Sequence, residues 1–231
     1  MSLTQTTWHC AKAMLTLTIP FQAIKSSRPR NTHRFCNLQA INILKRDGFR
    51  QEALLYHSFR DALNRGAVWC DKGFKNISHY YNHQANSGLW HGPDAPTECQ
   101  FYVNRAVKKW RQGRLSEAMF YLGAAVHIIQ DLCVPHHASG LVFGGHKFFE
   151  DWAREHYEDF TVNHGGIYDL ADSGADWVIE NAAVSATYLP QVINGNNSTA
   201  IAGVVEILLQ RAQKTTAGFL LYFHRLTQFK K

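Results

Sequence analysis

The sequence lacks the cysteine patterns that form zinc ribbons or redox-active pairs. Only five cysteines occur among its 231 residues, and no two form a Cys-x-x-Cys pair. Such a scattered, odd-numbered set favours buried thiols with at most one disulfide. The chain also lacks any apolar run of the roughly 18 residues that a membrane-spanning helix needs. We therefore expect no transmembrane segment and no sulfur-based metal site.

Charged residues are few, at 18% of the chain, while hydrophobic residues make up 45%. This balance excludes wholesale disorder, and the length is sufficient to bury a core without disulfides. The net charge of +6 is spread along the chain, so it suits anionic partners without identifying one. The unusual abundance is histidine, with 13 residues. Histidine chemistry is therefore the first place to look for function.

The first 30 residues differ from the rest. A moderately apolar stretch over 11–24 is interrupted by threonines and a proline, and a basic run follows it. Lys12 is the only early charge, and no clean cleavage site follows, so the pattern does not predict a signal peptide. We interpret residues 1–30 as an N-terminal extension and residues 31–231 as one domain.

Apolar residues recur at helical spacing through most of the chain, and no alternating strand pattern occurs. A region rich in Gly, Asn and Pro interrupts the helical pattern at 71–96. The sequence therefore predicts an all-α fold, a single-domain multi-helix bundle. The expected helices are 38–45, 51–66, 97–112, 115–133, 146–160, 174–192 and 199–227.

Histidines and carboxylates gather around the helix expected at 115–133. His127 and Asp131 stand four residues apart, so both side chains project from one helix face. His137 follows in the next turn, and His146 and Glu150 repeat the four-residue spacing at the start of the next helix. Each pair can bind a single ion from one face. Gly123 and Ala124, one turn earlier, leave room on or near that face for something bulky.

Each pair also has a simpler interpretation. A lone His-x-x-x-Asp on a helix is usually a hydrogen-bonded pair, and a His and Glu at a helix start can be a solvated face. If both interpretations held, the carboxylate of Asp131 would be buried beside an apolar stripe without a balancing positive charge. Burial of an unpaired charge costs free energy. A metal ion removes that cost. Di-iron bundles typically carry Glu-x-x-His, the opposite order, so zinc is favoured over iron or manganese.

The run from Met119 through Asp131, Pro135 and His137, followed by His146-x-x-x-Glu150, resembles the zinc-dependent phospholipase C family of bacteria. That family shares its fold with the single-strand-specific zinc nucleases. Three upstream motifs extend the resemblance over roughly 33–160. They are His33 before the Ala-Ile-Asn-Ile-Leu run at 40–44, the Trp-Cys-Asp motif at 69–71, and the Ser-His-Tyr-Tyr motif at 78–81.

The resemblance implies a cluster of three zinc ions. The first ion would be bound by Asp71, His79, His127 and Asp131. The second would be bound by His137, His146 and Glu150. The third would be bound by His33 and would share Asp131 with the first.

In family members the third ion is completed by the amino nitrogen and carbonyl oxygen of an N-terminal Trp. The only early Trp here is Trp8, farther ahead of His33 than in the family, so processing would have to expose it or the site is built differently. We expect two ions and predict a third with an incomplete ligand set. The family is usually secreted, but without a clear signal peptide the sequence assigns no location, and a cytoplasmic one stays open.

A zinc cluster of this kind favours phosphate esters. Three Zn²⁺ against three carboxylates leave a local surplus near +3, which attracts a phosphodiester and stabilises its transition state. Zinc also lowers the pKa of bound water to about 7. Asp71 is the candidate catalytic residue, as general base for the attacking water. Lys72 and Asn76 stand where choline-selective members of the family carry aromatics, so the sequence assigns no headgroup.

The resemblance implies a phospholipase C that releases diacylglycerol from phospholipid at a membrane surface. One alternative is a single-strand nuclease of the same fold, although no dedicated nucleic-acid motif occurs. A second alternative, which is not an enzyme, is a zinc-stabilised helical protein that binds a partner. We expect a monomer.

Overall fold

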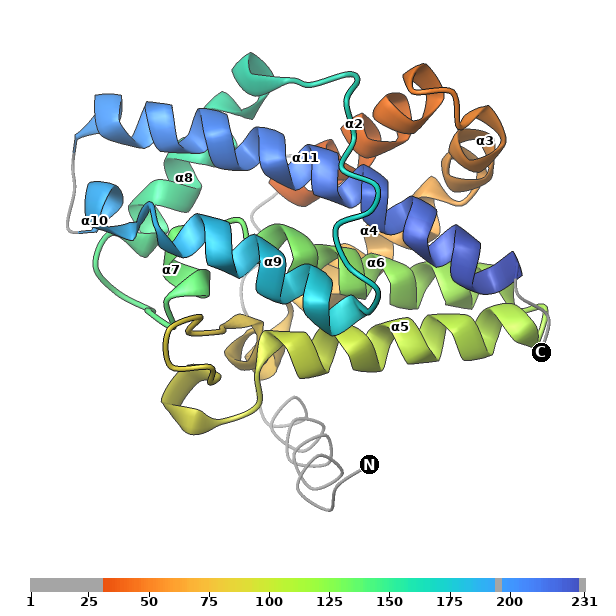
Figure 1. The fold of residues 1–231 in the computed structure, drawn as a ribbon, viewed down its shortest axis with the longest axis horizontal. Helices are drawn as coiled ribbons and strands as arrows, with labels where there is room; N and C mark the ends of the chain where they lie inside the picture. The colour runs from red at the N-terminus through yellow and green to blue at the C-terminus, as the bar shows by residue number, and fades with distance from the viewer. Residues whose placement is uncertain (1–30, 194–196, 229–231) are drawn as a thin grey trace.

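The computed structural model describes residues 31–193 and 197–228, and within them it is helical (Figure 1). No strand occurs among these residues; an isolated bridge joins Asn82 and Ser87. The all-α prediction is confirmed. The helices are α2 (Thr32–Arg46), α3 (Arg50–Ser58), α4 (Arg60–Cys70), η1 (Gly73–His79), η2 (Leu89–His91), α5 (Ala95–Arg111), α6 (Leu115–Asp131), α7 (Pro135–Ala138), α8 (His146–His156), η3 (Tyr157–Phe160), α9 (Gly174–Ala186), α10 (Leu189–Val192) and α11 (Ser198–Gln228). The expected extension at 1–30, with Trp8, lies outside the described residues.

Several helices begin and end where local chemistry requires it. The side chain of Asn31 accepts a hydrogen bond from the Arg34 amide and caps α2. Asp94 caps α5 in the same way through the Thr97 amide, and Ser173 caps α9. Basic residues occupy the last turns of α2 and α5, where their positive charge interacts favourably with the negative end of the helix dipole.

Helix α6 is the centre of the bundle, and Figure 1 shows it in the middle of the molecule with α5 alongside. Every residue from Leu122 to Asp131 is buried, so this half of the helix is enclosed on all sides. Helices α4 and α5 pack against α6, and α11 packs against both α2 and α6. The predicted ligand pair on this helix, His127 and Asp131, is therefore held by an element that is packed on all sides.

Two glycines set the close approach of α4 and α6. A Cβ added to Gly123 would lie 2.0 Å from the carbonyl oxygen of Leu63, and one added to Gly66 would lie 1.8 Å from that of Phe120. No side chain fits at either position. The expectation that Gly123 leaves room for something bulky is therefore wrong, because the backbone of α4 occupies that space.

Three expected helices are broken. The helix expected at 51–66 divides at Phe59, where the Ser58 hydroxyl bonds back to the Leu54 carbonyl, a contact that bends helices. The helix expected at 174–192 ends at Ala186, and Pro190 starts the short α10. The helix expected at 146–160 ends at His156, and η3 follows it.

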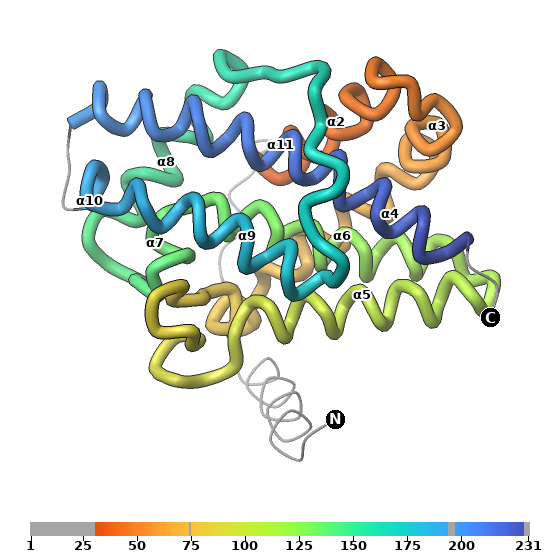
Figure 2. Tube along the Cα trace, in the orientation of Figure 1, coloured from red at the N-terminus to blue at the C-terminus, as the bar shows by residue number. Residues whose placement is uncertain are grey.

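Residues 161–173 form a strap that crosses α11 on the way to α9, as the tube in Figure 2 shows. The Ile167 amide donates to the Lys214 carbonyl of α11, and Gln213 of α11 bonds the Val162 amide and the Phe160 carbonyl. Gly218 permits this approach, since an added Cβ would lie 1.6 Å from the Ile167 oxygen. The strap therefore ties α11 to the rest of the bundle.

Two hydrophobic clusters form the core. The larger surrounds α6, and the smaller joins α2, α8, α10 and α11 through Cys36, Phe149, Val205, Leu208 and other residues. The four described cysteines, Cys36, Cys70, Cys99 and Cys133, are buried, as the sequence predicts, and form no disulfide with one another. Within 31–193 and 197–228, no helix has both the length and the apolar character needed to cross a bilayer.

Candidate metal centre

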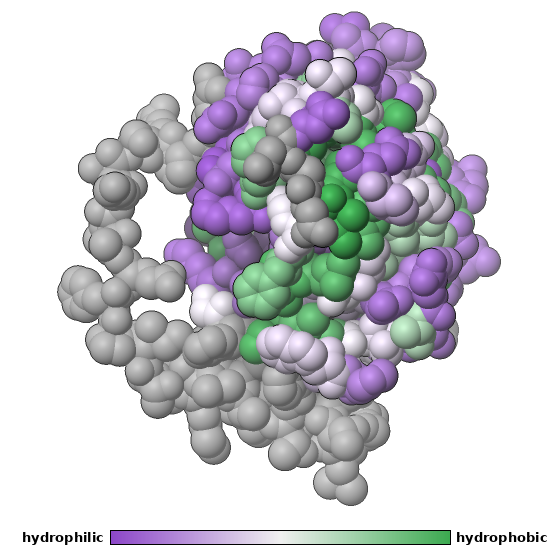
Figure 3. Space-filling model, turned by 90° about the vertical axis from the view of Figure 1, so that its left-hand side faces the viewer, coloured by the Kyte–Doolittle hydropathy of each residue, from purple (hydrophilic) through white to green (hydrophobic). Residues whose placement is uncertain are grey.

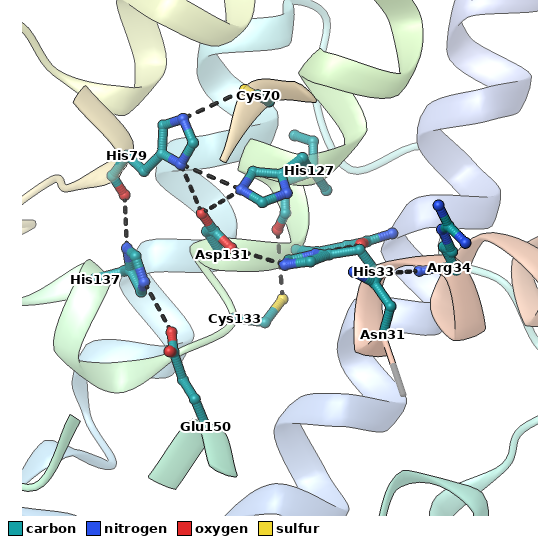
Figure 4. Close-up of polar contacts among 12 residues, drawn as sticks. Asn31, His33, Arg34, Cys70, His79, His127, Asp131, Cys133, His137 and Glu150 are labelled. Carbon is teal, nitrogen blue, oxygen red and sulfur yellow. Dashed lines mark hydrogen bonds and ion pairs between the residues drawn. The ribbon is translucent and has the colours of Figure 1, made fainter. Parts of the chain in front are cut away.

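Asp131 lies at the centre of the first group of candidate ligands (Figure 4). Its Oδ2 is 3.0 Å from His79 Nδ1 and 3.0 Å from His127 Nε2, and its Oδ1 is 3.6 Å from His33 Nε2. These side chains come from the last turn of α6, from η1 and from the first turn of α2. The carboxylate is 5% exposed. Three ring nitrogens therefore converge on one buried carboxylate.

Asp71 joins this group from the C-terminal end of α4. Ligand atoms of Asp71, His79 and His127 lie within 4.8 Å of one another, as do those of His33, His127 and Asp131. Asp71 is exposed, in contrast to the buried Asp131. The first group thus combines one carboxylate fixed in the core with one open to solvent.

His137, His146 and Glu150 form the second group. Glu150 Oε1 lies 2.8 Å from His146 Nε2 and 3.2 Å from His137 Nε2. His137 is held by the short α7, while His146 and Glu150 stand four residues apart on α8, as their spacing predicts. All eight predicted residues are therefore brought into two neighbouring groups. Their role as ligands stays a prediction.

Outer hydrogen bonds orient two of the imidazoles. His137 Nδ1 donates to the His79 carbonyl at 3.0 Å, and His33 Nδ1 donates to Gln130 Oε1 at 2.9 Å. A proton held on Nδ1 leaves the Nε2 lone pair directed at the carboxylates. Metal-binding histidines are typically oriented by such outer partners.

Gln130 belongs to a buried polar network that the sequence did not reveal. Its Nε2 donates to Asn37 Oδ1 and to Thr216 Oγ1, so α2, α6 and α11 meet at this side chain. The one signal in the sequence was Asn37, four residues after His33 and thus on the same face of α2. The network fixes the His33 ring relative to Asp131.

The charges of the two groups perturb each other. Burial raises the pKa of Asp131, but the neighbouring His127 and His137 outweigh burial and hold it well below its usual range. Burial lowers the pKa of His137, but Asp131 and Glu150 outweigh it and raise the value to about 9. Burial, aided by His127, lowers the pKa of His33. The Asp131 carboxylate therefore stays ionised and needs a positive counter-charge.

The residues present fit zinc. Imidazole nitrogens with carboxylate oxygens are a typical zinc donor set, and no thiolate is required. An Nε2 lone pair that faces a carboxylate oxygen is repulsive unless a proton or a cation lies between them. Such contacts occur at His33, His127, His137 and His146. Divalent cations at the two groups would relieve all of them at once.

A cavity of about 810 Å³ connects both groups to the smaller hydrophobic cluster. At one end it is lined by His33, Asp71, Asp131, His137, His146 and Glu150. At the other end it is lined by apolar side chains from α8 and α11, namely Phe149, Ala153, Val205, Leu208, Leu209 and Ala212. The charged residues belong to the two ligand groups and the apolar ones largely to the smaller hydrophobic cluster, so we refer to a charged end and an apolar end of the cavity; Arg154 also lines it.

The family model described as zinc-dependent phospholipase C matches residues 32–171, more than half of the chain. The chain belongs to the zinc-dependent phospholipase C family, and the resemblance inferred from the sequence is confirmed. The matched segment contains all eight candidate ligands. It ends before α9 and α11.

Curated relatives and a solved structure are consistent with this family assignment. A phospholipase C of Listeria monocytogenes is 26% identical over 228 residues, which cover 85% of this chain and 78% of that protein. One of Clostridium perfringens is 27% identical over 132 residues, 50% of this chain and 33% of that protein. The alpha toxin of Clostridium absonum superposes with a TM-score of 0.76 at 18% identity, over 90% of this chain and 66% of the toxin chain. The toxin likeness shows a shared fold.

Proposed function

We propose that this protein hydrolyses phospholipids as a phospholipase C, releasing diacylglycerol and a phosphorylated headgroup. The observation that carries the proposal is the cavity with two chemically different ends. A phospholipid has the same two parts, an anionic phosphodiester and apolar acyl chains joined through glycerol. The relatives named phospholipase C and the zinc-dependent family support the same activity.

The ligand groups define the end that binds phosphate. Asp71, His79, His127 and Asp131 would hold one zinc ion, and His137, His146 and Glu150 a second. His33, with a share of Asp131, would hold a third. When bound, zinc supplies positive charge for the phosphoryl oxygens and lowers the pKa of coordinated water. Asp131 faces both His33 and His127 and would tie the first and third ions together.

Asp71 is the residue we assign to proton transfer. Its carboxylate lines the cavity and is exposed, while Asp131 is buried among imidazoles. With one oxygen on the zinc ion, the other oxygen of this carboxylate would accept a proton from the water whose oxygen attacks phosphorus. The bond between phosphorus and the glycerol oxygen would then break, and the glycerol oxygen would take up the proton that Asp71 had accepted, which returns Asp71 to its ionised form.

The apolar end fits the glycerol-linked chains. The volume of the whole cavity, about 810 Å³, lies within the range of small-molecule sites, roughly 300–1,000 Å³. Leu208 and Val205 of α11 line the cavity together with Phe149 and Ala153 of α8, and all four belong to or pack against the smaller hydrophobic cluster. Water around an acyl chain would be displaced there, and burial of apolar area favours binding. We further propose that the protein acts as a monomer at a membrane surface.

The test is hydrolysis across a panel of mixed vesicles, each with one phospholipid headgroup. The zinc-loaded protein is expected to release diacylglycerol, to lose this activity with a chelator and to recover it with zinc. Cleavage of single-stranded DNA without lipid hydrolysis would instead support the nuclease. Full zinc loading without cleavage of any phosphodiester, including a chromogenic one, would support a non-catalytic binding protein.

A further inference from the structure

Trp90 is held in an exposed position by a strained turn. Its side chain is 77% exposed, and its backbone adopts φ 52° and ψ 36° in η2. His91 follows with φ 58°. The left-handed region is costly for residues with a Cβ, and for a bulky aromatic it is a rare outlier. Burial of the indole does not compensate the strain, which is a reason to ask what the exposed ring binds.

The turn that presents Trp90 is tightly built. The neighbouring Leu89 is buried at 6% exposure, and its carbonyl accepts the Gly92 amide at 2.9 Å. Gly88 fits only without a side chain, since an added Cβ would lie 2.5 Å from the Pro93 oxygen. The indole is therefore directed outward by a well-defined turn.

Phe143 is a second exposed aromatic, at 83%, in the loop that joins α7 to α8. It stands three residues before His146, and Gly144 and Gly145 follow it in the left-handed region. The Gly144 carbonyl accepts a hydrogen bond from His136 Nε2 at 3.0 Å. The end of this loop is therefore anchored beside the second ligand group.

The two loops share a base at the metal centre. The Ala95 amide donates to the Tyr80 carbonyl and closes the first loop directly after His79. The Tyr81 and His83 amides donate to the carbonyls of His137 and Ala138, where the second loop begins. Asn82 Nδ2 also bonds the Ser139 carbonyl. The first loop begins directly after His79, and the second joins His137 to His146. A partner that binds these two loops would therefore lie close to the candidate ligands.

Further apolar side chains lie at the same end of the molecule. Figure 3 looks at the end where α8, α10 and the start of α11 lie, and it shows a band of hydrophobic residues there. Exposed apolar residues on these segments include Phe148 on α8 and Ile193 directly after α10. Phe148 lies five residues after Phe143, so the second loop leads directly into this apolar surface.

We propose that Trp90 and Phe143 form a docking surface for the interface of a phospholipid bilayer. The inference rests on the proposed function, because the substrate phosphate of a phospholipase C lies at that interface. Indole rings favour the boundary between headgroups and acyl chains, since one edge is polar and the rest apolar. Insertion of the two rings would hold the metal centre near the phosphodiester.

The test compares Trp90→Asn, Phe143→Ser and the double variant with the wild type. Asn tolerates the left-handed backbone, so the turn is kept. Leu54→Ser is the matched control, because Leu54 is 68% exposed on α3, away from these loops (Figure 1). Three quantities are measured: sedimentation with neutral phosphatidylcholine vesicles in low salt and in 1 M salt, hydrolysis of a short-chain phosphatidylcholine below its micelle concentration, and the oligomeric state in solution.

Each single loop variant is expected to lower vesicle binding about tenfold, and the double variant more, with hydrolysis of the monomeric lipid unchanged. Leu54→Ser should change none of these quantities. Unchanged vesicle binding in the double variant would overturn the proposal. Wild-type binding that disappears in 1 M salt would also overturn it, because such binding would be electrostatic attraction. Self-association of the wild type that the loop variants abolish would overturn it as well, because the aromatics would then bind a second copy of the chain.

This outcome is separable from that of the proposed function. If the wild type binds vesicles through the two aromatics but cleaves no phospholipid, the docking surface stands and the proposed function fails. If the wild type hydrolyses monomeric and vesicle lipid with or without the aromatics, the function stands and the docking surface fails.

Discussion

His79 and His127 point ring nitrogens at each other across 3.2 Å, although they are 48 positions apart in the chain. Both nitrogens also lie 3.0 Å from Asp131 Oδ2. Such crowding of donors on one buried carboxylate is what a cation would organise, and it leads to the first prediction.

His127→Ala is expected to lower the zinc content and to destabilise the protein. Removal of a buried ring leaves a cavity in any case, so the informative measurement is the effect of a chelator. The melting temperature of the wild type should fall on chelation, because metal binding stabilises the folded state, and that of the variant should fall much less. His57→Ala, an exposed histidine on α3, is the control. Unchanged zinc content in His127→Ala would contradict the ligand assignment.

Glu150→Gln is expected to remove about one zinc ion per chain and to leave the ion at His127 in place. The amide keeps the size of the side chain but removes the charge that His137 and His146 face. Elemental analysis of the purified variant measures the loss. Glu155→Gln, an exposed change on the same helix, should retain full zinc content. Full content in Glu150→Gln would show that the second group is not an ion site.

Leu208→Trp is expected to lower activity on phospholipids with acyl chains while sparing a chromogenic phosphodiester without them. Leu208 is 1% exposed at the apolar end of the cavity, and the larger ring fills space that a chain would need. The ratio of the two activities should fall about tenfold, and overpacking should cost roughly 1–3 kcal/mol of stability. Ile207→Trp, next to it on α11 but 46% exposed, should keep the ratio. Equal losses of activity on both substrates would contradict the proposal that the apolar end of the cavity binds acyl chains.

Asp47→Asn is expected to destabilise the protein at neutral pH by about 2 kcal/mol. The carboxylate accepts the Gly165 and Gly166 amides at 3.0 and 2.8 Å and the Tyr168 hydroxyl at 2.5 Å, which fixes the strap. Burial raises the pKa of Asp47, but these hydrogen bonds outweigh it and lower the value below 3.8. Because the folded pKa is depressed, the stabilisation is present above pH 3.8 and is lost as pH falls through the folded value.

Urea unfolding at pH 7 and at pH 3 measures this effect. The difference between wild type and Asp47→Asn should shrink at the lower pH, where the wild-type carboxylate gains a proton. Asp172→Asn, an exposed change in the same strap, should behave like the wild type at both values. A constant difference between the wild type and Asp47→Asn at both pH values would show that the charge of Asp47 plays no part.

The sequence predicted the candidate site best where ligands are close along the chain. His127 with Asp131, and His146 with Glu150, have a spacing that fixes a shared helix face whatever the tertiary fold. His33, Asp71 and His79 could be placed beside them only through the family resemblance, because no local pattern brings α2 and η1 to the end of α6. The structure places them there.

Other features depend on packing that periodicity does not encode. Gly123 marks a close contact between backbones, and a sequence cannot distinguish this from space kept for a ligand. The Gln130 network joins three helices, so no single segment reveals it. The apolar end of the cavity is formed partly by α11, where the helical pattern predicted a buried stripe but not which residues face a cavity.

The family match ends at residue 171, between the candidate ligands and the long helix that borders the apolar end. All candidate ligands therefore lie within the matched stretch, whereas the part of the apolar lining that α11 supplies lies beyond it. Substitutions at Val205 or Leu208 would change the apolar lining without altering a candidate ligand. Under the proposed function, relatives that share the ion sites would therefore differ in acyl-chain preference through this helix.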